Sequence, residues 1–229
     1  MRDRSLIRLT RVTKRYRTAE LETTALDAVD LDVARGEFVA VMGPSGCGKS
    51  TLLHIVGLID APTSGEYVFA DRDVTACSED ELALVRRGHV GFVFQTFNLL
   101  EGLTVYQNVE MPLLFQRVPR RQRRNLVREA LELVGLSTRA NHKPDQLSGG
   151  QQQRVAVARA VVGDPKLILA DEPTGNLDTA NGADVMNMLS FLNEQGATIV
   201  MVTHSPSHAA RAHRVVNLLD GRLAAAAAV

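Results

Sequence analysis

The chain has 229 residues, and its 26 lysines and arginines balance its 26 aspartates and glutamates. A chain of this length can bury a substantial core in one domain. The balanced charge gives no indication of a nucleic-acid or acidic partner, and the two cysteines form no disulfide framework, which favours a reducing compartment. No uncharged apolar run approaches the roughly 18 residues of a membrane-spanning helix, so we expect any membrane role to come through a partner.

The first segments of the chain read as half-buried strands. Val29, Leu31 and Val33 alternate with more polar residues, a pattern typical of a strand with one solvated face. The segments Leu6 to Val33 and Glu66 to Val74 therefore predict an antiparallel β lobe.

Four short runs are apolar almost throughout, as expected of parallel strands that are covered on both faces. These runs are Phe38–Met42, Val90–Phe94, Leu167–Ala170 and Thr198–Val202. Helical patterns lie between them, at Ser50–Leu58, Glu79–Arg87 and Ala180–Gln195. Strands that alternate with helices predict a wound α/β core.

Between the second and third of these runs the pattern becomes helical. Val105–Gln116, Arg120–Val134 and Gly149–Val162 read as helices, with no convincing strand among them. We therefore predict one domain over residues 1–229. In it, residues 1–95 and 163–229 form the β lobe and the wound α/β core, and residues 96–162 form an inserted helical subdomain.

A phosphate-binding pattern, G-x-x-x-x-G-K-[ST], follows the first apolar strand and directly precedes a helix. Its glycines let backbone N–H groups point at phosphate oxygens, and the helix N-terminus favours negative charge. Lys49 is expected to reach the β- and γ-phosphates, and Ser50 to ligate Mg²⁺. An ordinary glycine-rich turn is the alternative, which the Lys-Ser pair and the flanks disfavour. The loop residues assigned to nucleotide binding are Gly43, Pro44, Ser45, Gly46, Cys47, Gly48, Lys49, Ser50 and Thr51.

Two carboxylates end another apolar strand, and a proline follows them. Asp171 is placed to orient Mg²⁺, and Glu172 to act as general base toward an attacking water. A solvated acidic pair that closes a strand is the alternative, and the presence of the phosphate loop disfavours that interpretation.

The phosphate loop also contains a cysteine. The groups that bind phosphate there favour a thiolate over a thiol, so we expect Cys47 to be more reactive than Cys77 if Cys47 is accessible.

Three further elements complete an ordered set. Gln95 follows Gly91–Phe94, His204 follows another apolar strand, and Ser148 is a suitable N-cap for a helix that begins with two glycines. Together with Leu147–Gln151 and the strand that ends in Asp171 and Glu172, the set resembles the ATP-binding subunit of an ATP-binding-cassette (ABC) transporter. The resemblance covers nearly the whole chain and implies that the α/β core is of the P-loop, RecA-like type.

The resemblance implies roles for several residues. Ser148, Gly149, Gly150 and Gln151 match the signature that contacts the γ-phosphate of ATP held by the opposite subunit, so that two ATPs are enclosed in a head-to-tail homodimer. The resemblance also implies that Gln95 contacts Mg²⁺ and the attacking water and that His204 contacts the γ-phosphate. It places Asp178 in a loop at the dimer interface, and it implies that Tyr16 stacks on adenine. Packing alone is the alternative for Tyr16.

Some segments resemble one subgroup, the ATPases of macrolide exporters, lipoprotein-releasing complexes and the cell-division ABC pair. They are Gly57–Glu66, Gly91–Gln95, Asn141–Pro144 and Ala170–Asp178. The resemblance implies a separately encoded permease with a large extracytoplasmic domain, driven by mechanotransmission at the cytoplasmic face of the inner membrane. The chain departs from the subgroup at Gln107, where Glu is usual, and at Ser205, where Asp is usual, although Ser205 can still cap a helix.

One basic run lies in the expected helical subdomain, at Arg117, Arg120, Arg121, Arg123, Arg124 and Arg128. A solvated helix face is the favoured interpretation. Contact with anionic lipid headgroups is the sharper alternative. Binding of nucleic acid is a third interpretation, which is disfavoured because no aromatic residues are interleaved with the arginines.

The sequence therefore predicts a homodimeric ATPase subunit of an inner-membrane ABC complex, with ATP and Mg²⁺ as cofactors. One alternative shares the chemistry but regulates cell-wall hydrolases and transports nothing. Another is a soluble ABC ATPase that acts on nucleic acid or ribosomes, which would normally need a coiled-coil insertion or a second cassette. A nucleotide-binding kinase is a third, in which the signature and His204 would have no role.

Overall fold

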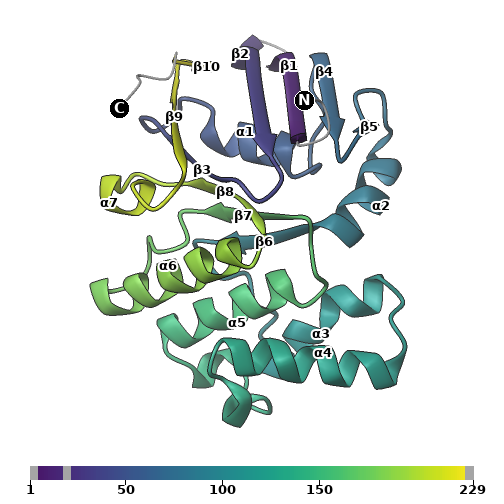
Figure 1. The fold of residues 1–229 in the computed structure, drawn as a ribbon, viewed down its shortest axis with the longest axis vertical. Helices are drawn as coiled ribbons and strands as arrows, with labels where there is room; N and C mark the ends of the chain where they lie inside the picture. The colour runs from purple at the N-terminus through teal and green to yellow at the C-terminus, as the bar shows by residue number, and fades with distance from the viewer. Residues whose placement is uncertain (1–4, 18–21, 225–229) are drawn as a thin grey trace. The chain divides into compact units, whose positions relative to one another are not determined.

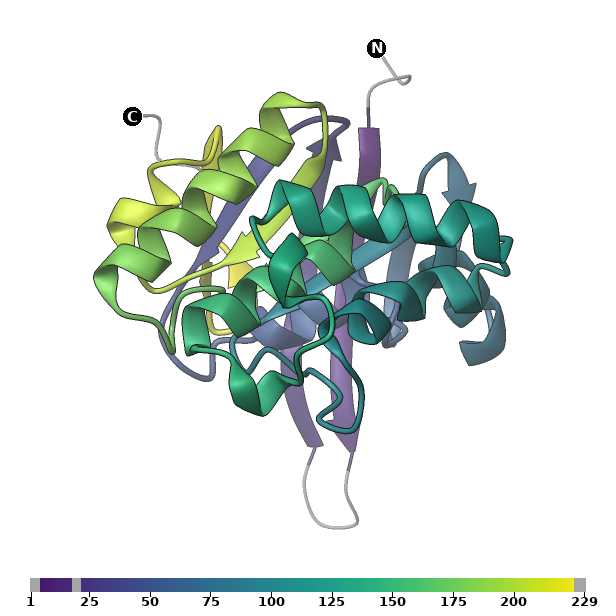
Figure 2. The ribbon, with the colours of Figure 1, turned by 90° about the horizontal axis from the view of Figure 1, so that it is seen from below.

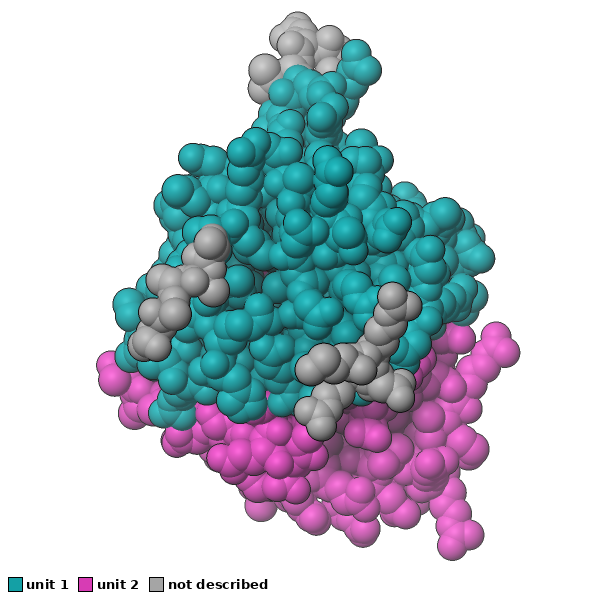
Figure 3. Space-filling model, turned by 45° about the horizontal axis from the view of Figure 1, so that its top comes forward, with its two compact units in different colours: residues 1–86, 198–229 teal, residues 87–197 magenta. Residues whose placement is uncertain are grey.

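The computed structural model describes residues 5–17 and 22–224. The chain divides into two compact units, residues 1–86 with 198–229 and residues 87–197 (Figure 3). The expected helical segment 96–162 lies entirely in the second unit, which also contains two strands and a further helix. The expected boundaries of the helical subdomain thus remain a prediction.

The first unit contains an antiparallel sheet with the strand order β2-β1-β4-β5 (Figure 1). Its strands are β1 (Ser5–Arg17), β2 (Glu22–Ala34), β4 (Ser64–Phe69) and β5 (Arg72–Asp73). Apolar side chains of β1 and β2, such as Ile7 and Val33, are fully buried. Both strands are irregular, because Arg11 and Ala28 adopt positive φ angles of 49°. The predicted β lobe is confirmed.

The same unit contains parallel strands. β3 (Phe38–Met42) pairs in parallel with both β8 (Thr198–Val202) and β9 (Arg214–Leu219), and β9 pairs antiparallel with β10 (Arg222–Leu223). Sequence reasoning found β3 and β8 because they are apolar, and every residue of β8 is buried. It missed β9, in which only Val216 and Leu218 are buried. The helices of this part are α1 (Lys49–Val56), α7 (Pro206–Ala209) and α2 (Glu79–His89), whose last residues belong to the second unit.

The second unit combines a parallel strand pair with helices. β6 (Val90–Phe94) pairs with β7 (Leu167–Asp171) from Val90↔Leu167 to Phe94↔Asp171. Its helices are α3 (Val105–Phe115), α4 (Arg120–Leu133), α5 (Gly149–Val161) and α6 (Thr179–Glu194), with the short 3₁₀ turns η2 (Ser137–Arg139) and η3 (Pro144–Gln146). The helices α3, α4 and α5 pack against one another (Figures 1 and 2).

Helix α5 also packs closely on β6. A Cβ atom at Gly91 of β6 would lie 2.1 Å from the Ala160 carbonyl oxygen of α5, so only glycine permits this approach. All six predicted helices are confirmed, each to within two residues at either end.

Candidate functional site

The glycine-rich loop joins β3 to α1 in the first unit. Helix α1 begins at Lys49 and is preceded by Gly48, whose φ of 105° lies in the region that favours glycine. A Cβ atom at Gly48 would also lie 2.3 Å from the Ala25 carbonyl oxygen. Gly46 has a φ of 79°. The predicted strand, loop and helix are therefore present, and the loop depends on glycine for both its backbone angles and its space.

Lys49 lies within this loop. Its side chain is only 7% exposed, and its Nζ donates hydrogen bonds to the carbonyl oxygens of Gly43 at 2.9 Å and Pro44 at 2.8 Å. An ammonium group, backbone N–H groups and a helix N-terminus at one place make a donor set that fits phosphate. Cys47 is 5% exposed, whereas Cys77 is half-buried, so the condition of accessibility for a reactive Cys47 is not met.

His204 leaves the sheet beside the phosphate loop. Strand β8 pairs in parallel with β3 at Val41↔Val202, and the Thr203 N–H donates to the Val41 carbonyl at 3.2 Å. Because parallel strands end at one edge, His204 and Gly43 both follow at that edge. Ser205 accepts a hydrogen bond from the His208 N–H and caps α7, as predicted.

Tyr16 belongs to a small polar cluster of the first unit. Its hydroxyl donates to Asp60 Oδ2 at 3.0 Å, and Lys14 Nζ donates to Asp60 Oδ1 at 2.6 Å. Lys14 Nζ also lies 5.0 Å from the centre of the Tyr16 ring. Burial and the Asp60 hydrogen bond raise the pKa of Tyr16. Partial burial opposes the shift at Asp60, but hydrogen bonds from Lys14 and Tyr16 leave its pKa lowered. The ring is 42% exposed and is held by its hydroxyl, a geometry compatible with stacking.

Gln95 and Glu172 follow neighbouring strand ends in the second unit, since Phe94 and Asp171 are paired. Gln95 Nε2 donates to Asn176 Oδ1 at 3.1 Å, and Asn176 Nδ2 donates to the Gln95 backbone carbonyl oxygen, also at 3.1 Å. The chain turns at Glu172, whose φ is 47° and whose Oε1 atom is buried. Gly175 N–H donates to the Glu172 carbonyl at 3.0 Å, which closes the turn. The structure thus brings Gln95, Asp171 and Glu172 together.

The signature segment forms the start of α5. Ser148 caps this helix by accepting from the Gln151 N–H at 3.3 Å, while the Gln151 side chain accepts from the Ser148 N–H at 3.1 Å. The predicted cap is confirmed. A Cβ atom at Gly150 would lie 2.1 Å from Asn181 Oδ1, so the amide of Asn181 occupies the space beside that glycine.

The Asn181 amide connects the signature glycine to the beginning of α6. Asp178 caps α6, accepting from the Asn181 N–H at 2.9 Å and from Asn181 Nδ2 at 2.6 Å. These hydrogen bonds lower the pKa of Asp178. Sequence reasoning missed Asn181, because nothing in its local pattern distinguishes it from an exposed helical residue.

Each unit therefore assembles its own part of the predicted site. The first contains Tyr16, the loop from Gly43 to Thr51, and His204; the second contains Gln95, Asp171, Glu172, the signature and Asp178. The predicted metal ligands Ser50, Gln95 and Asp171 all offer oxygen donors, the type that Mg²⁺ prefers. Within the described part of the chain, no helix is both long and apolar enough to cross a bilayer.

A family model described as ABC transporter matches residues 26–175, which include the phosphate loop, the signature and both acidic residues of β7 and its turn. The chain belongs to the ABC transporter family. The macrolide export ATP-binding/permease protein MacB 1/2 of Paracoccus denitrificans is 50% identical over 96% of this chain. The chain spans 33% of that relative.

Two other similar proteins match along nearly their whole length. An uncharacterized ABC transporter ATP-binding protein of Methanocaldococcus jannaschii is 49% identical over 95% of this chain and 97% of its own. A dimeric ATP-binding cassette, solved in a post-hydrolysis state bound to ADP and Pi, superposes with a TM-score of 0.88. It is 46% identical, over 96% of this chain and 97% of that one. The predicted family, the ABC nucleotide-binding fold and the class of enzyme, an ABC-type ATPase, are confirmed.

Proposed function

We propose that this chain is the ATP-binding part of an inner-membrane ABC complex and that ATP hydrolysis at a head-to-tail homodimer drives a permease by mechanotransmission. The observation that carries the proposal is the phosphate loop, in which Lys49 Nζ is buried against two loop carbonyls. The relatives support it: one is an export ATP-binding/permease protein by name, and another is a cassette dimer bound to ADP and Pi.

Each group in the site has a proposed role in the reaction. Lys49 and the loop N–H groups hold the β- and γ-phosphates, and Tyr16 stacks on the adenine. Glu172 accepts the proton of the attacking water, which Gln95 and His204 help to orient against the γ-phosphate. Ser50, Asp171 and Gln95 would hold Mg²⁺, which would neutralise charge on the phosphate oxygens.

Dimerisation completes the proposed site. Ser148 and Gly150 of the partner subunit lie at the N-terminus of α5, where N–H groups and the helix dipole favour the γ-phosphate. The capping box between Ser148 and Gln151 supports this role, because it fixes the backbone of the first helical turn.

The second unit offers a surface for the permease. A cavity of about 280 Å³ is lined by β6, the end of α3 and α5, and Phe115 of α3 is 58% exposed. Gln116, the residue after Phe115, lines this cavity, and an exposed aromatic side chain suits a protein contact. Phe115→Asp should therefore reduce copurification with the membrane partner, while Phe191→Asp, at another exposed position on α6, should not.

The decisive experiment replaces Glu172 with glutamine. The side chain keeps its shape but loses its basicity, so ATP should still bind and turnover should fall by about 10²–10⁴-fold. We expect a stable ATP-dependent dimer in sedimentation or gel filtration. Undiminished turnover would refute the role assigned to Glu172. A chain that stays monomeric with ATP would refute the proposed dimer.

A further inference from the structure

Gln153 is a fully buried polar residue on α5, one turn beyond the signature glycines. Its side chain is 0% exposed. Its Nε2 donates to the Pro173 carbonyl oxygen at 2.6 Å and to the Phe94 carbonyl oxygen at 3.3 Å. Sequence reasoning gave Gln153 no role, because a glutamine in a helix is ordinarily a solvated residue.

The two acceptors adjoin the proposed catalytic groups. Phe94 directly precedes Gln95, and Pro173 directly follows Glu172. One amide group therefore joins the ends of β6 and β7 at the two points where the chain leaves the sheet toward these groups. Gln95 and Asn176, which follow those points, are themselves hydrogen-bonded to each other. Gln153 therefore contacts the backbone at both strand ends, and the residues that follow these strand ends contact each other.

The oxygen atom of the Gln153 amide is energetically unfavourable where it lies. Its Oε1 atom is buried and has no hydrogen-bond partner among the described residues. A buried acceptor without a partner costs free energy that an apolar side chain of similar size would not. The value of a glutamine here must therefore lie in its two donated hydrogen bonds. Such local violations of packing rules are expected at functional sites.

We propose that Gln153 is a positioning residue that couples the signature of its own subunit to Gln95 and Glu172 of the same subunit. This inference rests on the proposed head-to-tail dimer, in which the signature serves the ATP of the opposite subunit and Gln95 and Glu172 serve their own. Gln153 lies four positions after Gly149 in the same helix, about 6 Å along its axis. A shift of the two catalytic turns therefore moves the signature, and one ATP site of the dimer senses the other.

The test compares nucleotide binding with dimerisation. Two substitutions of Gln153 are made in the Glu172→Gln background, and both remove the two hydrogen bonds. Gln153→Met keeps an unbranched side chain, and Gln153→Leu places an apolar side chain there. We expect ATP affinity of the monomer to stay within about twofold, and the ATP-dependent dimer to weaken by about tenfold or more. With Glu172 restored, the ATP dependence of turnover should lose its cooperativity, and kcat should fall more than KM rises.

Gln122→Met, an exposed glutamine on α4, controls for the chemical change and should dimerise as the parent does. Dimer affinity and cooperativity equal to the parent in both Gln153 variants would overturn the inference. So would unfolding of both variants at room temperature, which would make the amide a requirement of the fold alone. Failure of the Glu172→Gln parent to dimerise would instead refute the proposed function, and the two failures are therefore distinguishable.

Discussion

At the scale of single residues, the phosphate loop shows how a backbone angle and a close contact act together. Gly46 and Gly48 both have positive φ angles, but only Gly48 has a neighbour, the Ala25 carbonyl oxygen, where a Cβ would lie. We expect Gly46→Ala to lower the free energy of unfolding by about 1–2 kcal/mol, the cost of a left-handed non-glycine residue. Gly48→Ala should cost more, because its Cβ would lie 2.3 Å from that oxygen.

Denaturant unfolding of the two variants measures this difference. If Gly48→Ala is no less stable than Gly46→Ala, the loop does not adopt the conformation described, and its cradle of N–H groups loses its support. The pair is well matched, since both substitutions add one methyl group to the same loop.

Tyr16 and Asp60 predict an effect on nucleotide affinity. Tyr16→Phe keeps the ring but removes the hydroxyl that donates to Asp60. A hydrogen bond of this kind contributes about 1 kcal/mol, so KM for ATP should rise by about fivefold if the bond orients the ring for stacking. The value of kcat should not change, because Tyr16 does not touch the reacting atoms. Tyr106→Phe on α3 is the control, and an equal rise in KM for both variants would contradict the assignment.

Candidate site residues could be named from the sequence only where chemistry imposes a local pattern. Lys49, Asp171 and Glu172 became candidates because a phosphate loop and a strand end specify residue types and spacing. Asn181 and Gln153 were missed, because their importance comes from contacts with Gly150, Phe94 and Pro173, which are distant in the sequence. No window of the chain contains that information.

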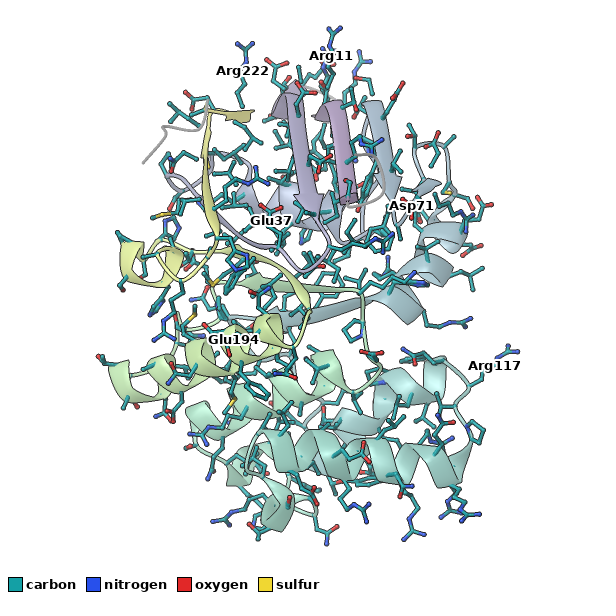
Figure 4. The ribbon with its side chains drawn as sticks, viewed as in Figure 1. Arg11, Glu37, Asp71, Arg117, Glu194 and Arg222 are labelled. Carbon is teal, nitrogen blue, oxygen red and sulfur yellow. The ribbon has the colours of Figure 1, made fainter. Side chains whose placement is uncertain are left out.

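At the scale of secondary-structure elements, α4 carries the basic run. Arg123 makes contacts within the fold: its guanidinium group forms an ion pair with Glu110 at 2.8 Å and donates to the Val118 carbonyl oxygen at 2.7 Å. Arg120, Arg121 and Arg124 are exposed, and Figure 4 shows Arg117 pointing away from the second unit just before α4. These exposed arginines are accessible both to solvent and to anionic headgroups.

Reversal of the exposed charges separates these two interpretations. If α4 contacts anionic headgroups, Arg120, Arg121 and Arg124 replaced by Glu should lose binding to phosphatidylserine vesicles, and added salt should reproduce the loss. The same reversal at the exposed Arg11, Arg72 and Arg211 changes net charge equally and should have a smaller effect. Vesicle sedimentation measures both. Equal binding by the two triple variants would leave α4 as a solvated face.

Element prediction succeeded where burial is one-sided or complete and failed where it is mixed. Fully apolar strands such as β8 and amphipathic helices such as α4 carry a periodicity that the sequence displays directly. Strand β9 begins with a polar residue and contains an asparagine, so its apolar content is too low to stand out. Its place beside β3 is decided by tertiary pairing rather than by local preference.

At the scale of the whole molecule, the two units divide the proposed chemistry between them. The phosphate loop belongs to the first unit and the signature to the second, and each half-site of the proposed dimer takes Lys49 from one subunit and Ser148 from the other. Ser148→Arg places a bulky cation at the helix N-terminus and removes a cap worth about 1 kcal/mol. We expect its homodimers to be inactive, as Lys49→Ala homodimers should be.

Mixing these two inactive variants tests the arrangement. A mixed dimer has one half-site with both defects and one that combines intact Lys49 with intact Ser148, so equal mixing should restore up to about a quarter of wild-type turnover. Ser137→Arg, at an exposed position of η2, should be active alone and controls for the added charge. If Lys49 and Ser148 instead acted within one subunit, every active site in the mixture would carry one defect. Turnover would then stay at the level of the single variants, and the head-to-tail dimer would have to be abandoned.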